Sequence, residues 1–550
     1  MRRAGDQAGP ARATDRTAQP LSVVAAAIAM RTGRAEGARF RIEDMLQAAV
    51  FPHATGPIEL AETHISWVVL TGPYAYKIKK PVRFEFIDCS TLERRRMLCE
   101  EELRLNRRFA PGLYLDVVPI RAGPSGLQVD AQGDIVEYAV RMRQFERTEE
   151  LAVLLARHAI GTHELADLGA QLAGFHAQAA AARPDGRWGS PAQLEALQSG
   201  NLASLQAVAA GHVATSVLAP LGEWLHTELA RLRATIDGRR SAGRVRECHG
   251  DLHARNVVRW QGRLLPFDCL EFDPALRWTD VAGDIAFLHM DLLGHARADL
   301  SAAFLSAYLE DGGDYGALRL LRLFAVHRAL VRAKVDALQA TAAAAARCMA
   351  RVELARRLIE PRTAAMILMH GHSGSGKSWL SEQLVPALGT LRVRSDVERK
   401  RLAGLGALDR SGAGAPGAGL YGGGGTLRTY ARLAECARHA LAAGQDIIVD
   451  AAFLQAGQRM AFRSLAHEEG CTALIVSCAA APDVLRTRVQ ARERSGADPS
   501  DATLEVLERQ LAEAEPLTPE EQAQALVLDT SAPTSIAALA AAIRQRLARP

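Results

Sequence analysis

The amino-acid sequence predicts two folded units, an α+β unit made of two lobes followed by an α/β unit with a parallel sheet. Three observations support this fold class. Strand-like runs between residues 58 and 145 precede a long, Ala/Leu-rich and mostly helical stretch. After Pro361, strands alternate with helices to the C-terminus, which is typical of a parallel sheet. The length of 550 residues accommodates two to four domains of roughly 150 residues each.

The composition excludes several classes of protein. The chain is 48% apolar and 23% charged, so it can bury a core. Its net charge of +4 is small for its length and argues against a broad nucleic-acid-binding surface. The eight cysteines form no CxxC pair, which argues against a disulfide scaffold and a zinc site. No apolar run approaches the roughly 20 residues of a membrane span. We therefore expect a cytoplasmic protein without a membrane segment.

Residues 1–40 are rich in Ala, Arg, Gly and Thr and show no sustained periodicity. One run of ten apolar residues, Leu21 to Met30, imitates the core of a signal peptide. Acidic residues precede it (Asp6 and Asp15) and Arg31 follows it directly, which a signal peptide does not favour. We expect a poorly ordered N-terminal extension or a start codon placed too early.

The first unit is expected over residues 41–360, with an N-lobe at about 45–145 and a helical C-lobe at 146–360. In the N-lobe, two strand-like runs flank a Gly-Pro turn and read as a hairpin. The elements predicted there are strands at 65–70 and 74–79, a helix at 91–108 capped by Ser90 or Thr91, and a strand at 137–145. The elements predicted in the C-lobe are helices over 149–240 and 295–360, with short strands and turns over 245–288. The second unit is expected over 361–550.

The segment CHGDLHARNVVRWQGRLLPFD, residues 248–268, carries the first group of chemically suggestive residues. Strand-like runs on both sides of Gln261-Gly262 predict a hairpin that brings Asp268 back beside Asn256. A carboxylate and an amide at one place can hold Mg²⁺ through oxygen ligands. Asp251, on the preceding turn, is then placed to accept a proton from an attacking hydroxyl, as in kinase-type phosphoryl transfer.

His-Gly-Asp-Leu-His-x-x-Asn at 249–256 resembles the catalytic loop of the aminoglycoside phosphotransferase family, the small-molecule branch of the protein-kinase-like fold. The resemblance implies a two-lobed kinase-like domain. In it Asp251 is the catalytic base, Asn256 and Asp268 bind Mg²⁺, His253 supports the loop and Asp284 anchors a later helix. There is no GxGxxG before the expected ATP-binding lysine and no APE segment after Asp268. Both absences favour a small-molecule acceptor over a protein acceptor.

A kinase-like fold also needs a lysine on the third strand paired with a glutamate on the next helix. The run Tyr-Lys77-Ile-Lys79 supplies two candidates, which share one face of an alternating strand. If the opposite face, with its aromatic and aliphatic side chains, packs outward under the helix, either lysine can line the cleft. We favour Lys77, with Lys79 nearly as good. Glu102 is the favoured partner and Glu101 is the alternative.

Residues 371–378, GHSGSGKS, satisfy GxxxxGK[ST] between a buried strand-like run and a helical run, the setting of a true P-loop. The backbone of such a loop curls around phosphate, its lysine bridges the β and γ oxygens, and its Ser hydroxyl binds Mg²⁺. The residues expected to bind nucleotide are Gly371, Ser373, Gly374, Ser375, Gly376, Lys377 and Ser378, the last of these through the metal.

The rest of this unit resembles the P-loop kinases of the polynucleotide-kinase, gluconate-kinase and zeta-toxin group. That resemblance makes Asp396 the base or acceptor ligand and makes Arg399 a residue that steers the acceptor. Asp450, at the end of a strand, is a Walker-B-like carboxylate for the metal. Arg488 and Arg492 are candidate lid residues that would close on the phosphates. A Gly/Ala-rich loop at 403–425 falls where elements that bind the acceptor are expected.

Together these features predict a bifunctional, ATP- and Mg²⁺-dependent phosphotransferase that acts on hydroxyls of small-molecule or nucleotide-like acceptors. In one alternative, one unit binds nucleotide only to regulate or scaffold the other. In another, the C-terminal unit is a nucleic-acid 5′-hydroxyl kinase, which the near-neutral charge disfavours, and no obligate protein partner is inferred. A cationic aminoglycoside would need acidic side chains near the catalytic loop, and the candidates are Glu271, Asp273, Asp280 and Asp291.

The chain has only six lysines against many arginines, so each surviving lysine is informative. Five of them fall at the two proposed phosphate sites. They are Lys77, Lys79, Lys80, Lys377 and Lys400. Lys334, on a predicted helix, has no proposed role.

Overall fold

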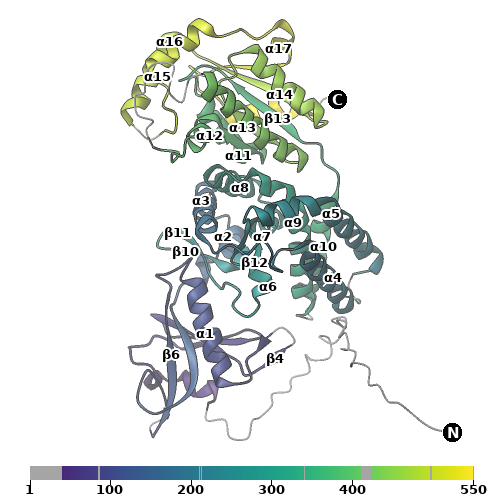
Figure 1. Cartoon of the computed structure of the whole chain (residues 1–550). Helices are drawn as coiled ribbons and strands as arrows, with labels where there is room; N and C mark the ends of the chain where they lie inside the picture. The colour runs from purple at the N-terminus through teal and green to yellow at the C-terminus, as the bar shows by residue number, and fades with distance from the viewer. Residues whose placement is uncertain are drawn as a thin grey trace, which may run out of the picture.

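The computed structural model describes residues 40–84, 87–124, 126–209, 211, 213–339, 341–409, 423–495 and 498–548. Figure 1 shows three bodies in succession, an N-terminal β-rich lobe, a helical lobe and a C-terminal α/β part. The fold class is the predicted one, a two-lobed α+β kinase-like fold followed by an α/β fold with a parallel sheet. Of the expected N-terminal extension at residues 1–40, residues 1–39 lie outside the described residues.

The N-terminal lobe is built on a six-stranded sheet in the order β1-β2-β3-β8-β6-β7, and each pair of neighbouring strands is antiparallel. Its strands are β1 Glu59–Glu62, β2 Ser66–Leu70, β3 Tyr74–Lys79, β6 Tyr114–Gly123, β7 Gly126–Val129 and β8 Asp134–Arg143, with a small separate pair of β4 Arg83–Phe84 and β5 Ile87–Asp88. The predicted hairpin is confirmed, since Val69 pairs with Tyr76 across β2 and β3. The predicted helix is α1 Leu92–Asn106, whose N-cap Thr91 accepts a hydrogen bond from the Arg94 N–H.

The two faces of β3 have different partners. Tyr76 and Ile78 pack in an apolar cluster with residues of the 3₁₀ segments η1 Ile42–Leu46 and η2 Ala48–Val50. The expectation that this face lies under the helix was therefore wrong. Helix α1 covers the opposite face, which carries the lysines, because that is where its Glu102 ion-pairs.

The helical lobe begins after β8 and encloses a small group of strands. Its elements are η3 Arg147–Glu149, α2 Leu151–Ala156, α3 Thr162–Gln178, α4 Pro191–Val208, α5 Thr215–Ser241, β9 Val245–Glu247, η4 Ala254–Asn256, β10 Val257–Trp260, β11 Arg263–Pro266, α6 Pro274–Arg277, β12 Trp278–Asp280, α7 Val281–Gly294, α8 Ala298–Gly312, η5 Tyr315–Ala317, α9 Leu318–Ala337 and α10 Ala342–Ile359. Helix α7 occupies the end of the stretch expected to hold strands and turns. Its sequence is apolar almost all round, because it is buried on nearly every side, and it therefore shows no amphipathic period.

The C-terminal part is a five-stranded parallel sheet in the order β14-β15-β13-β16-β17. Its elements are β13 Ala365–His370, α11 Lys377–Leu388, β14 Leu391–Arg394, α12 Ser395–Leu402, α13 Gly423–Ala442, β15 Ile447–Asp450, α14 Ala456–Glu468, β16 Thr472–Ala479, α15 Pro482–Ser495, α16 Leu504–Glu513, α17 Pro519–Gln524, β17 Leu526–Asp529 and α18 Ile536–Leu547. The register places both Met369 and Arg394 beside Asp450, so the segments that follow these strands leave the sheet at one edge.

The helical lobe and the C-terminal part meet along α8, β14 and α13. One apolar cluster continues across the junction, joining Leu318 and Tyr315 to Val393 and Cys436. The Tyr315 hydroxyl donates to the backbone carbonyl of Arg392 at 2.8 Å. In the part of the chain that the structure describes, no helix combines the length and apolar character needed to cross a bilayer.

Candidate active sites

The segment between β9 and β10 forms the first candidate site. The Asn256 amide nitrogen donates to the Asp251 backbone carbonyl at 3.0 Å and to Asp251 Oδ2 at 3.1 Å. His253 Nε2 lies 3.3 Å from the same carboxylate oxygen. Burial alone would raise the pKa of Asp251, but His253 and Arg332 hold it well below its usual range. The Asp251 side chain keeps 29% of its surface exposed, so an ionised carboxylate faces solvent at this loop.

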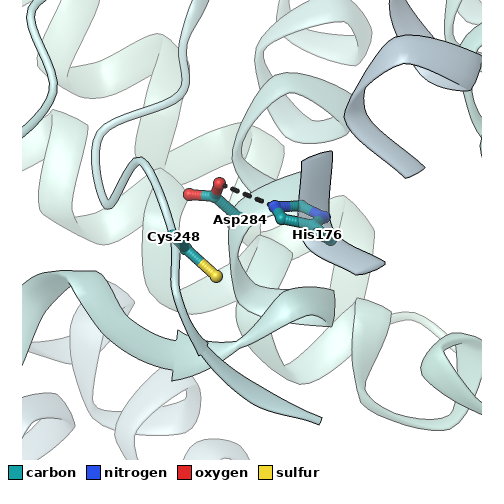
Figure 2. A group of neighbouring side chains, drawn as sticks. All are labelled: His176, Cys248 and Asp284. Carbon is teal, nitrogen blue, oxygen red and sulfur yellow. Dashed lines mark hydrogen bonds and ion pairs between the residues drawn. The ribbon is translucent and has the colours of Figure 1, made fainter. Parts of the chain in front are cut away.

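Asp284, in the first turn of α7, anchors this loop through hydrogen bonds to its backbone. Its two carboxylate oxygens accept hydrogen bonds from the His249 N–H at 3.0 Å and the Gly250 N–H at 2.9 Å. His176 Nε2 of α3 lies 3.2 Å away (Figure 2). Gly250 has φ +84°, and a Cβ there would lie 3.0 Å from the Leu276 carbonyl oxygen, so only glycine fits comfortably. These contacts fix the backbone of the two residues that precede Asp251, His249 and Gly250.

His176, Cys248 and Asp284 place their potential ligand atoms within 4.8 Å of one another, the spacing of a metal site (Figure 2). The groups do not fit a metal. Both Asp284 oxygens already accept backbone hydrogen bonds. Burial raises the pKa of the Cys248 thiol well above its ordinary value, and its Sγ lies 3.6 Å from the Thr279 carbonyl. His176 Nδ1 lies 2.9 Å from the Tyr308 hydroxyl. The group is a buried structural anchor for the catalytic loop.

Asp268 follows β11, and its backbone adopts φ +60°, a left-handed conformation that Asp tolerates better than most residues. Lys77 Nζ donates to Asp268 Oδ1 at 2.5 Å and to Glu102 Oε1 at 2.7 Å. Burial alone would lower the pKa of Lys77, but the two carboxylates raise it well above its ordinary value. Strand β3, helix α1 and the segment after β11 therefore meet at one ammonium group.

Lys79 lies on the same face and is more deeply buried. Its Nζ is 2.6 Å from Glu102 Oε2 and also contacts Glu271. Glu102 thus bridges both lysines. Glu101, the alternative partner, instead pairs with Arg104 and Arg277 on the other side of α1. Of the two lysines, Lys77 alone reaches Asp268.

The residues at this site suit Mg²⁺ and a nucleotide phosphate. Asn256 uses its amide nitrogen for Asp251, which leaves its amide oxygen as a ligand atom. Asp268 commits one carboxylate oxygen to Lys77 and keeps 44% of its side chain exposed. Oxygen ligands of this kind are those that Mg²⁺ prefers.

The second candidate site lies at the carboxyl edge of the parallel sheet. The loop between β13 and α11 packs tightly on α15, where a Cβ at Gly374 would lie 2.8 Å from the Leu485 carbonyl oxygen. Lys377 Nζ makes one long contact, 3.4 Å to the His372 carbonyl, and the buried Ser375 hydroxyl lacks a partner in the described part of the chain. The Ser378 hydroxyl donates to Asp450 Oδ1 at 3.2 Å. Lys377 and Ser375 therefore have donors available for a phosphate, and the neighbouring Ser378–Asp450 pair has oxygens suited to a metal ion.

Asp396 and Arg399 lie on the first turns of α12, beyond β14. Arg399 Nη1 is 2.6 Å from Asp396 Oδ1. Burial alone would raise the pKa of Asp396, but Arg399 and Lys377 lower it. The carboxylate therefore lies within the electrostatic reach of the P-loop lysine. Most of the loop expected to help bind the acceptor, residues 410–422, lies outside the described residues.

The two candidate lid arginines on α15 differ. Arg488 donates to the Gly374 carbonyl at 3.3 Å and to the Thr530 carbonyl at 2.8 Å. It lines a hollow of about 480 Å³ beside the P-loop, together with Gly376, Trp379, Leu380 and residues 530–534. Arg492 donates to the Ala502 carbonyl at 2.8 Å and does not line this hollow.

Two parts of this site were missed by sequence reasoning. The loop at 530–534 follows β17, and its position after a strand of a parallel sheet was the available signal. Glu310 belongs to α8 of the helical lobe, yet its oxygens lie 3.1 Å from Arg392 Nη2 and 3.4 Å from Arg394 Nη1. Arg394 Nε is 3.8 Å from Asp450 Oδ2. No local sequence signal could have connected Glu310 with the P-loop.

The four carboxylates considered for a cationic acceptor all have structural partners. Glu271 pairs with Lys79, and Asp273 accepts from the Ala275 N–H as the cap of α6. The other two are also held: Asp280 pairs with Arg239 and caps α7, and Asp291 pairs with Arg351 and accepts from the Ala254 N–H.

Comparison with known proteins yields matches to both parts. A model described as "Phosphotransferase enzyme family" matches residues 93–321, and one described as "AAA domain" matches residues 366–517. The uncharacterized protein Rv2004c of Mycobacterium tuberculosis is 30% identical over 455 residues, covering 82% of this chain and 88% of that protein.

Among solved structures, a putative kinase from Chloroflexus aurantiacus is 23% identical, with a TM-score of 0.29, and the match covers 34% of this chain and 98% of that one. A choline kinase from Cryptosporidium parvum is 11% identical, with a TM-score of 0.38, and the match covers 58% of this chain and 94% of that one.

Proposed function

We propose that each of the two parts of this chain transfers the γ-phosphate of ATP to an acceptor hydroxyl. The chain belongs to the same family as the mycobacterial protein Rv2004c, and it is an ATP-dependent kinase. We take the acceptors to be small molecules. The single observation that carries the proposal for the first part is the set of contacts joining Lys77 to both Glu102 and Asp268. The proposed boundary between the parts remains near residue 360.

In the first site, Asp251 is the proposed base. Its low pKa keeps the carboxylate ionised at neutral pH, and its exposed edge can accept the proton of an approaching hydroxyl. Asn256 fixes the orientation of that carboxylate through two hydrogen bonds. Mg²⁺ held by Asn256 and Asp268 would neutralise charge on the phosphates. Lys77 would hold the phosphates against the N-lobe once they replace its contact with Asp268.

In the second site, Lys377 is the proposed phosphate ligand, and Ser378 with Asp450 is the proposed metal site. Asp396 would orient or deprotonate the acceptor hydroxyl, and Arg399 would hold the acceptor. Arg488 and the loop at 530–534 would enclose the nucleoside. The more distant Arg492 keeps its proposed lid role only if α15 moves on nucleotide binding.

The test measures ATP consumption and phosphate transfer by the full chain, Asp251→Ala, Lys377→Ala and the double variant. We expect each single variant to retain one activity and to lose the other, with a loss of roughly 10²–10⁴-fold for Asp251→Ala, the usual contribution of a positioned base. If Asp251→Ala leaves phosphorylation of every acceptor intact, the first part is not a kinase.

A regulatory relation between the parts is a second candidate, and the contacts of Glu310 favour it. In that case Lys377→Ala would abolish nucleotide binding at the P-loop and alter the activity that depends on Asp251. Independent kinases would leave that activity unchanged.

A further inference from the structure

Helix α9 brings cationic side chains close to the loop that carries Asp251. Arg332 Nη1 lies 2.9 Å from His253 Nε2, which itself lies 3.3 Å from Asp251 Oδ2. Arg328 is one helical turn earlier and therefore shares a face with Arg332. The charge of Arg332 lowers the pKa of Asp251, and the charge of Asp251 in turn raises the pKa of Arg328.

Arg328 is an unusual buried cation, with 7% of its surface exposed. Its guanidinium lies over the Phe287 ring at 4.7 Å, and its Nε makes one long contact, 3.4 Å to the Gly283 carbonyl. No carboxylate of the described residues forms an ion pair with it. Burial lowers its pKa, and the more distant Asp284 and Asp251 only partly oppose this effect. A buried cation without an ion-pair partner is costly, so an anion bound beside Arg328 would be stabilised.

Arg332 also has donors to spare. Its Nε is buried and has no hydrogen-bond partner in the described part of the chain. Asp291 lies near Arg332, whose charge helps to lower the Asp291 pKa, but its ion pair is with Arg351, and Asp280 ion-pairs with Arg239. The neighbourhood of the proposed base therefore offers guanidinium donors and no free acidic group among the residues described above.

We propose that the acceptor of the first site carries an anionic group, a phosphate or a carboxylate, which Arg332 and Arg328 bind while its hydroxyl faces Asp251. This inference rests on the proposed function of that site. Guanidinium groups are suited to such ligands because they present paired N–H donors to two oxygens. The ATP phosphates are expected instead at Lys77, which contacts Asp268. A polycationic aminoglycoside would be repelled by these two arginines.

The first experiment measures binding without requiring turnover. The probe is inorganic phosphate, titrated by calorimetry into the full chain that carries Lys377→Ala, with Mg-ADP saturating so that the nucleotide site of the first part is filled. We expect Arg332→Gln to weaken phosphate binding about tenfold, the loss of one charge-assisted hydrogen bond. The control is Arg231→Gln, which removes an exposed arginine of α5 that pairs with Glu228 and should change nothing. Equal binding by the Arg332→Gln and Arg231→Gln variants would overturn the inference.

The second experiment tests the substrate class in the same Lys377→Ala background. Matched acceptors are compared by phosphate transfer from ATP: ribose with ribose 5-phosphate, glycerol with glycerol 3-phosphate, and the polycation kanamycin. We expect transfer to favour the anionic member of each pair, and Arg332→Gln to raise the KM for that acceptor about tenfold while leaving the KM for ATP unchanged.

The outcomes separate the two proposals. A preference for a neutral or cationic acceptor, or an effect of Arg332→Gln on the KM for ATP alone, contradicts the anionic acceptor and leaves the kinase proposal standing. Phosphate binding that depends on Arg332, together with no Asp251-dependent ATP turnover, supports the anion site and contradicts the proposed kinase activity. Arg328→Lys tests the deeper cation, and its circular dichroism spectrum shows whether the variant is folded before binding is measured.

Discussion

At the scale of single residues, the first site depends on a carboxylate that never meets the substrate. Asp284 has none of its surface exposed and holds the backbone N–H groups of His249 and Gly250. Burial alone would raise its pKa, but His176, His249 and the backbone donors lower it from 3.8 to about 2. An acid whose pKa is lower in the folded state stabilises the fold above its unfolded pKa, and that contribution disappears as the pH falls toward 2.

We expect Asp284→Asn to lower the free energy of unfolding at pH 7 by about 2.5 kcal/mol, from a pKa shift of just under two units. The difference from the wild type should begin to narrow below about pH 4, because the Asp284 carboxyl of the unfolded wild-type chain then takes up a proton while that of the folded chain stays ionised until about pH 2. Urea unfolding of both proteins at a series of pH values between 3 and 7 measures this. The exposed Glu353, paired only with Arg356 on α10, provides the control Glu353→Gln. A difference that stays constant down to pH 3 would contradict the linkage.

Single site residues could be predicted from the sequence where a residue type with known chemistry also lay at a position fixed by the period of a strand. The alternation of side chains along β3 predicted that Lys77 and Lys79 share one face, and in the structure both form ion pairs with Glu102. The choice between Glu101 and Glu102 could not be made in advance, because adjacent helical residues point about 100° apart and packing decides which faces the strand. Arg328 and Arg332 gave no signal, since they lie far along the chain from the loop that they approach.

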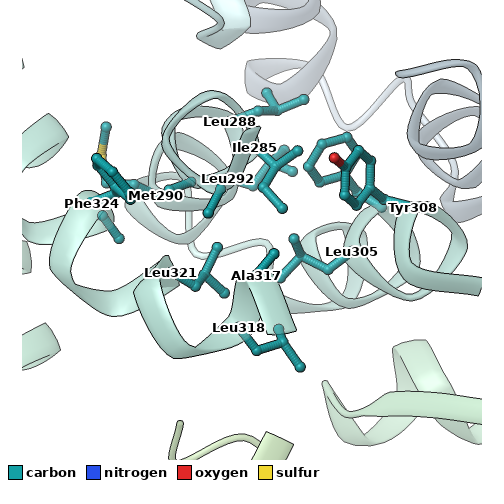
Figure 3. Packing of buried hydrophobic residues seen from close by; sticks show 14 of the residues in the cluster. Ile285, Leu288, Met290, Leu292, Leu305, Tyr308, Ala317, Leu318, Leu321 and Phe324 are labelled. Atoms are coloured by element: carbon teal, nitrogen blue, oxygen red, sulfur yellow. The ribbon is translucent and has the colours of Figure 1, made fainter. Parts of the chain in front are cut away.

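At the scale of elements, the strands and helices around the two motifs could be predicted from turn residues and caps, whereas α7 could not. Figure 3 shows why, because α7 contributes side chains such as Ile285, Leu288 and Leu292 to a core shared with α8 and α9. A helix surrounded by apolar neighbours needs no polar face. Burial on all sides therefore removed the periodicity that would have revealed it.

Leu321 of α9 lies in this core and is 1% exposed. We expect Leu321→Ala to lower the free energy of unfolding by about 2–5 kcal/mol, because the surrounding helices cannot fully close the cavity. Leu321→Met keeps the volume nearly constant and should cost less than about 1.5 kcal/mol. Chemical denaturation of the three proteins gives the comparison. Equal stability of the Ala and Met variants would mean that the core at this position is loosely packed.

At the scale of the whole molecule, the two candidate sites are joined through a single helix. Tyr308 of α8 contacts His176, which supports Asp284 and the first catalytic loop. Two residues later, Glu310 contacts Arg392 and Arg394 of the second part. The junction around α8 is also apolar and continuous with the core of the helical lobe. The sequence could indicate two units, but the Glu310 contacts that join them link residues more than 80 positions apart.

We infer from these contacts that Glu310 positions residues of the P-loop site. It neutralises Arg392 and Arg394, and Arg394 lies within 3.8 Å of Asp450, the proposed metal ligand. Arg392 also donates to the Ser378 carbonyl and the Ser381 hydroxyl, so the loss of Glu310 would mainly affect Arg394. Without Glu310, Arg394 would lose its nearest carboxylate and could turn toward Asp450, where it would compete with the metal. We expect Glu310→Gln, in the Asp251→Ala background, to raise the Mg²⁺ concentration needed for half-maximal ATP consumption about tenfold, as outer-shell partners of metal ligands commonly do.

The measurement is a Mg²⁺ titration of ATP consumption by the full chain, because cutting near residue 360 would expose the apolar junction. Glu310→Asp keeps the charge and should restore part of the affinity for Mg²⁺, which a purely structural role would not require. Glu353→Gln again controls for the loss of an exposed carboxylate. An unchanged Mg²⁺ requirement in Glu310→Gln would show that the helical lobe holds the P-loop part in place without tuning its metal site.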